Sequence, residues 1–217
     1  MNKIFQAENR SSDRQKQKIF SIVHGFKYFL MTNILLAIFT AIFFINKSGW
    51  QVNGSTSVEM FVAFAQPFVI LLSIIAGFKP YEKIKKIKFD KEQSKEWTAL
   101  LIAIILISMF SLVFLGANIP FPSTLIFGML SMNFMVALYS IIFHPFAIRI
   151  YEANFYQGDK SLLDNVFKYL SIYLMGINYF VQKQLLKLPL IINKLVAIIF
   201  VLFLVWQMFI VVDIFNQ

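Results

Sequence analysis

Long apolar runs separated by short polar connectors dominate the chain. The clearest run, Trp97–Ala117, holds about twenty residues without a charge. At 1.5 Å rise per residue, a helix over this run would reach roughly 30 Å, which is the thickness of the hydrocarbon core of a bilayer. Comparable runs cover residues 28–45, 58–78, 125–148 and 190–212. The pattern predicts an all-α fold, a polytopic transmembrane helical bundle.

The segment Ser161–Lys187 has a mixed pattern that leaves the number of spans open. Asp159 or Ser161 is a candidate helix cap at its start. Six positions spaced 4, 3, 4, 3 and 4 residues apart form one face of a helix, and all but the methionine are polar: Asp164, Lys168, Ser171, Met175, Asn178 and Gln182. Such a helix either crosses the membrane with the stripe turned into the bundle, or lies in the interface.

Two topologies follow from this segment. Six spans are favoured because Tyr169–Val181 is too uniformly apolar to rest half in water. Five spans are the alternative, which keeps Lys183, Lys187 and Lys194 inside the cell and puts the C-terminus outside. The alternative agrees better with the tendency of positive charge to stay inside.

Positive charge orients the predicted bundle. The densest basic block is Lys79–Glu96, and the positive-inside tendency places it, together with the N-terminus, in the cytoplasm. Residues 1–27 form a basic cytoplasmic or interfacial segment that precedes a single transmembrane domain over 28–215. The loop also offers a candidate docking surface for a partner, made of Lys83, Lys85, Lys86 and Lys88.

Composition strengthens the membrane interpretation. Hydrophobic residues make up 59% of the chain and charged residues only 14%, whereas soluble domains carry about a quarter charged residues. Lipid is therefore the expected solvent over most of the surface. The net charge of +9 comes from lysines in short flanking loops, so we expect no nucleic-acid partner. Abundant Phe, Ile and Lys with scarce Arg favour a bacterial multi-pass protein of the cell membrane.

Motifs that carry catalysis are missing from the sequence. The chain has no cysteine and only two histidines, and it lacks H-E-x-x-H, G-x-S-x-G, P-loop and dinucleotide-binding patterns. No charged residue lies near the middle of a predicted span, although ion-coupled carriers usually place one there. We therefore expect no enzyme, no metal and no cofactor.

One polar constellation is a candidate site. His144-Pro145 is followed by Arg149 and Glu152, which share a helix face one to two turns further on. The group is either a pH-sensitive hinge or headgroup contact, or an interfacial histidine followed by a snorkelling arginine and its ion-pair partner. The second interpretation is favoured. A membrane enzyme centred on His144 and Glu152 is the weakest alternative.

The predicted spans also contain five amide side chains: Asn33, Gln66, Asn133, Asn178 and Gln207. They either line a polar path or hydrogen-bond neighbouring helices, at roughly 0.6 kcal/mol each. Interhelical links are the commoner role for such residues, so this role is favoured.

Two stretches resemble the YesL-like family of bacterial membrane proteins, whose members are often encoded beside carbohydrate ABC importers. They are Phe26–Thr40, FKYFLMTNILLAIFT, and Phe143–Ser171, in which a span ends at an aromatic-Pro pair and a lysine-bearing helix follows. The resemblance implies an accessory subunit or modulator of a transport system. The predicted function is thus a non-catalytic membrane subunit that binds another integral membrane protein or itself, and the alternative is a small permease or channel-like facilitator.

Overall fold

The computed structural model describes residues 20–78, 93–156 and 161–216. The basic segment before residue 20 and the docking lysines of the loop, Lys83 to Lys88, lie outside these ranges. The elements in chain order are α2 (Ile22–Ile45), the 3-10 turn η1 (Lys47–Gly49), α3 (Gly54–Gly77), α4 (Gln93–Ser111), the 3-10 turn η2 (Leu112–Ala117), α5 (Ser123–Tyr156), α6 (Leu162–Leu185) and α7 (Leu190–Phe215). The predicted all-α class is confirmed.

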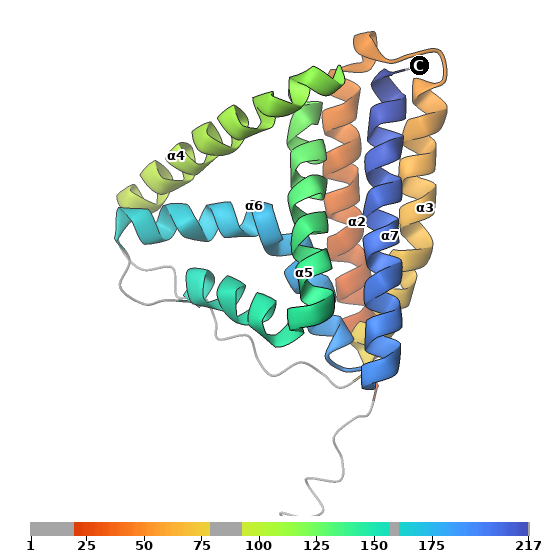
Figure 1. Cartoon of the computed structure of the whole chain (residues 1–217), viewed down its shortest axis with the longest axis vertical. Coiled ribbons are helices and arrows are strands. Elements are labelled where there is room, and N and C mark those ends of the chain that lie inside the picture. Colours follow the sequence, from red (N-terminus) through yellow and green to blue (C-terminus); the bar gives the residue numbers. More distant parts are fainter. Residues whose placement is uncertain (1–19, 79–92, 157–160, 217) are drawn as a thin grey trace, which may run out of the picture.

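Helices α2, α3, α7 and the first part of α5 run side by side as a bundle (Figure 1). Its core is rich in phenylalanine, and the Phe68 ring of α3 stacks on Phe200 and Phe203 of α7 at centroid distances of 5.5 and 5.1 Å. Helices α2 and α3 approach closely at Gly25, where an added Cβ would lie 2.7 Å from the Ser73 carbonyl oxygen. Only glycine fits at that crossing.

Hydrogen bonds show which segments share each end of the bundle. At the lower end in Figure 1, the Ser21 N–H donates to the Gly77 carbonyl (2.8 Å), so the start of α2 meets the end of α3. At the other end, the Gln51 N–H donates to the Ile214 carbonyl (3.0 Å) and the Asn216 side chain donates to the Ala117 carbonyl (2.6 Å). The first connector, the end of η2 and the C-terminus therefore lie together, opposite the start of α2.

Five helical stretches in the described part of the chain are long and apolar enough to cross a membrane, and α6 is not one of them: Ile22–Ile45, Gly54–Gly77, Lys95–Ala117, Ser123–Phe143 and Leu190–Phe215. The structure thus agrees with the five-span alternative, and the preference for six spans was wrong. The reason is the composition of α6, which is less apolar than the five candidate spans. It contains the charged residues Asp164, Lys168 and Lys183 besides the buried polar residues Ser171, Asn178 and Gln182. The predicted cap is confirmed, because Ser161 and Asp164 form a reciprocal capping box.

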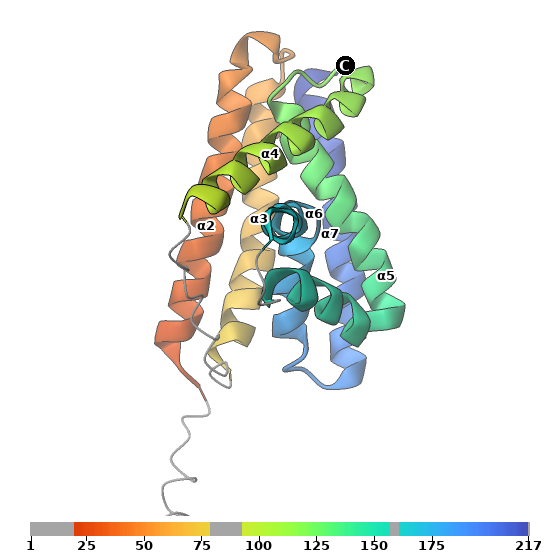
Figure 2. The same cartoon turned by 90° about the vertical axis from the view of Figure 1, so that its left-hand side faces the viewer.

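Helix α5 bends sharply at Phe143, which has non-helical dihedral angles (φ −111°, ψ 46°). We call Ser123–Phe143 the long arm and residues 144–156 the short arm. The predicted span over 125–148 therefore ends five residues early. The short arm and the first half of α6 lie across the direction of the bundle (Figures 1 and 2). α3, by contrast, continues as one helix through Pro67.

Helix α4 leans away from the bundle (Figure 1). Its start packs on α6, where Ala99 and Ala103 are fully buried against Val166 and its neighbours. The following turn, η2, lies at the end of the bundle that holds the C-terminus of the chain. There it meets α5 through the Phe114 and Phe127 rings, whose centroids are 5.3 Å apart. Helices α4 and α5 therefore meet near the connector between them and then diverge (Figure 1).

Candidate functional site

The bend of α5, which we call the elbow, contains the polar constellation that the sequence singled out. Pro145 has no backbone N–H, so the Ile141 carbonyl four residues earlier lacks its helical donor. The Lys194 amine of α7 donates to that carbonyl. A cation from another helix thus satisfies the group that the proline leaves free, which stabilises the bend.

The short arm is held to α6 through Glu152. Its Oε1 accepts hydrogen bonds from Lys183 Nζ (2.9 Å) and from the Tyr179 hydroxyl (3.0 Å). The Tyr151 ring of the short arm stacks on the Tyr179 ring at 4.0 Å. Burial lowers the pKa of Lys183. The prediction that Glu152 is the ion-pair partner of Arg149 was wrong, because the carboxylate serves Lys183 on α6.

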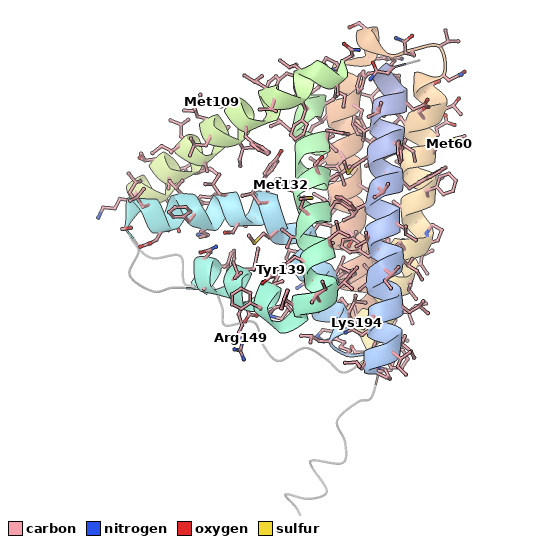
Figure 3. The ribbon with its side chains drawn as sticks, viewed as in Figure 1. Met60, Met109, Met132, Tyr139, Arg149 and Lys194 are labelled. Carbon is pink, nitrogen blue, oxygen red and sulfur yellow. The ribbon has the colours of Figure 1, made fainter. Side chains whose placement is uncertain are left out.

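The other two members of the constellation lie apart from this ion pair. Arg149 is exposed and has no hydrogen-bond or ion-pair partner among the described residues. It projects from the short arm away from α6 (Figure 3). The His144 side chain lies outside the described part of the structure, so no contact of its ring is assigned.

An open apolar pocket of about 190 Å³ lies in the inner angle of the elbow. Both arms of α5 and one residue of α6 line it: Met135, Val136, Tyr139, Ala147, Ile150 and Met175. Figure 3 labels Tyr139 on the long arm. The pocket exists because the bend turns two stretches of one helix toward each other without closing the space between them.

Asn133 joins the long arm to the backbone of α6. Its Nδ2 donates to the Tyr173 carbonyl (3.1 Å), and its Oδ1 accepts the Asn178 N–H (2.9 Å). In an uninterrupted helix these two groups belong to the i→i−4 ladder, and a side chain inserted there is a known cause of bending. α6 changes direction where it passes behind α5, which agrees with this insertion (Figure 1).

The polar contact continues along the α5–α6 interface. Asn178 Nδ2 donates to Ser140 Oγ (3.0 Å), and Gln182 Nε2 donates to Asn178 Oδ1 (3.3 Å). All four side chains of this group are at least 98% buried (relative exposure 2% or less). Because the amide donors point at the neighbouring helix or along α6, the group links two helices.

The remaining predicted amides form two further interhelical links. Gln66 Nε2 donates to Asn33 Oδ1 (2.7 Å), which joins α3 to α2. Gln207 Nε2 donates to the Phe61 carbonyl (3.2 Å), which joins α7 to α3. The structure thus pairs Asn133 with Asn178 and Asn33 with Gln66, and it leaves Gln207 in a third group. Each of the three groups lies between a different pair of helices.

Sequence reasoning missed the roles of three lysines around the connection between α6 and α7, namely Lys183, Lys187 and Lys194. Besides Lys183 and Lys194, the Lys187 amine donates to the Ala76 carbonyl at the end of α3 (3.0 Å), and burial lowers its pKa. Cations at helix C-termini are favourable because the last carbonyls there lack donors. Pro145 was the available signal for Lys194, because it marks a carbonyl without a helical partner.

The described residues contain no group of three or more His, Cys, Asp or Glu side chains with metal-binding proximity. No protein-family model, curated protein or solved structure matches the chain. The resemblance to the YesL-like family is therefore carried by its two stretches alone and stays a prediction.

Proposed function

We propose that this chain is a non-catalytic integral membrane subunit that binds another integral membrane protein along α4. The observation that carries the proposal is the divergence of α4. This span packs on its own chain at its start through Ala99 and Ala103, and again at its last residue, Ser111, which is fully buried, and at η2. The stretch between leaves the bundle (Figure 1).

The outer face of α4 suits a partner helix. Leu101, Ile105 and Met109 recur every four residues and are 60%, 50% and 64% exposed. Residues spaced in this way form a continuous ridge, which packs into the groove of a second helix. Since lipid tails are as apolar as leucine, the gain on association would come from close packing along this ridge.

The buried amides support the same role. Their donors join α5 to α6, α2 to α3 and α7 to α3, as expected of a rigid scaffold. In line with the resemblance, we propose that the partner belongs to a transport system. We also propose that the chain spans a bacterial cell membrane five times, with its lysine-rich end in the cytoplasm.

Site-specific photocrosslinking in membranes tests the proposal. Benzoylphenylalanine at Met109 should yield a discrete crosslinked protein. The matched control is Leu202 of α7, which is 63% exposed against 64% for Met109 but lies on the bundle. A band at Met109 that is missing at Leu202 supports the proposal. Lipid adducts alone at Met109, or the same bands at both positions, would refute it.

A further inference from the structure

The elbow pocket and Arg149 lie on two flanks of the same short arm. Ala147 and Ile150 line the pocket, whereas Arg149, which lies between them in sequence, projects away from α6 (Figure 3). A helix with its side chains is roughly 10 Å across. The headgroup layer on each side of a bilayer is roughly 5–8 Å thick. A helix lying flat in the interface therefore reaches from the headgroups to the first methylenes of the tails.

Each flank has the chemistry of one part of a lipid. The exposed guanidinium has no acidic partner among the described residues. Arginine matches phosphate oxygens with paired N–H donors. The pocket of about 190 Å³ is lined by apolar side chains and the Tyr139 ring. An apolar cavity of about 150 Å³ holds benzene, so this pocket is large enough for about six carbon atoms of a chain.

We infer that the elbow binds a phospholipid, with its phosphate at Arg149 and part of one acyl chain in the pocket. The two contacts contribute differently. The acyl chain leaves one apolar medium, the bilayer, for another, so its transfer into the pocket gains little free energy. The pocket contributes van der Waals contacts and fixes the position of the chain. The charge contact supplies most of the selectivity and favours anionic lipids, since each arginine near the surface attracts them. The site is independent of the partner proposed for α4.

Native mass spectrometry of the full chain with added phosphatidylglycerol measures this binding. Arg149→Gln should weaken it about fivefold, which corresponds to about 1 kcal/mol. Met135→Trp, which fills the mouth of the pocket at a 61% exposed position, should weaken it by a similar factor. The controls are Lys27→Gln, an exposed cation on α2, and Met60→Trp, an exposed methionine on α3.

Helix content by circular dichroism should be unchanged in all four variants, because each site is solvent- or lipid-exposed. Inorganic phosphate should not compete with the lipid, which separates a lipid site from a site for free phosphate. Equal losses in Arg149→Gln and Lys27→Gln would mean general surface attraction and would overturn the proposal. Undiminished binding to Met135→Trp would overturn it as well, because the pocket would then hold no tail.

Discussion

The contact between Asn133 and α6 gives the sharpest test of how this fold is held together. Replacing Asn133 with leucine keeps the number and branching of the side-chain heavy atoms and removes both of its bonds to the α6 backbone. The Tyr173 carbonyl and the Asn178 N–H then lose the partners that they have at 3.1 and 2.9 Å. Because Asn133 and Asn178 are 0% and 2% exposed, water does not replace the lost amide.

The expected loss follows from the two stranded groups. A buried backbone group without a partner costs about 1–3 kcal/mol. Leucine is easier to bury than an amide, which offsets part of this cost. We therefore expect Asn133→Leu to lower the free energy of unfolding by about 2 kcal/mol, at the low end of the sum for two groups. Asn33→Leu is the matched control: Asn33 Oδ1 accepts one side-chain bond, from Gln66, so its loss should be about 0.6 kcal/mol.

Unfolding by SDS in mixed micelles, followed by the helical signal and extrapolated linearly, measures both losses. Hydrogen exchange at the Asn178 amide gives a second readout, since this N–H loses its acceptor in Asn133→Leu and should exchange faster than in Asn33→Leu. Equal losses of stability in the two variants, together with unchanged protection at Asn178, would refute the reasoning.

Two further predictions concern the elbow and the orientation. Lys194→Met should lower the free energy of unfolding by about 1–2 kcal/mol, because the Ile141 carbonyl loses its donor. This loss should be smaller in a Pro145→Ala background, where residue 145 has a backbone N–H again. Lys187→Met is the control in the same unfolding assay: the Lys187 amine bonds the Ala76 carbonyl, so its loss should not depend on residue 145. In the cysteine-free chain, a single cysteine at Val52 should react with a membrane-impermeant thiol reagent added to intact cells, and one at Leu186 should not. Reaction at both positions would contradict the five-span topology, and the reverse result would contradict its orientation.

Local structure was the predictable part of this fold. Apolar runs gave the helices within a few residues, because a span must be both long and uncharged. The α2 helix starts six residues before the predicted Tyr28, since Ile22, Val23 and Phe26 continue its apolar surface in exposed positions. Ser161 was a predictable cap because the capping box needs only residues three apart.

Direction and long-range pairing were not predictable from the same pattern. The spacing of the polar residues in α6 shows which face of the helix is polar, but it does not show in which direction the helix runs relative to the bundle. Its direction depends on contacts with α5, such as that of Asn133, which is 45 residues before Asn178. Glu152 likewise has an acceptable partner at Arg149, three residues away, yet pairs with Lys183, which is 31 residues away. Spacing along the sequence favours Arg149 as the partner of Glu152, whereas the packing of the short arm against α6 brings Lys183 to it instead.

The three lysines that opposed a six-span topology now have a common explanation. Lys183, Lys187 and Lys194 bond to a carboxylate, to the end of α3 and to the elbow carbonyl, respectively. Lys187 contacts α3 at Ala76, next to the Gly77 carbonyl that accepts from Ser21 at the start of α2. A hydrogen bond to a carbonyl leaves the charge of an amine in place, so such a lysine still contributes to orientation. The three lysines therefore fit the five-span topology in two independent ways, through their internal hydrogen bonds and through the positive-inside tendency.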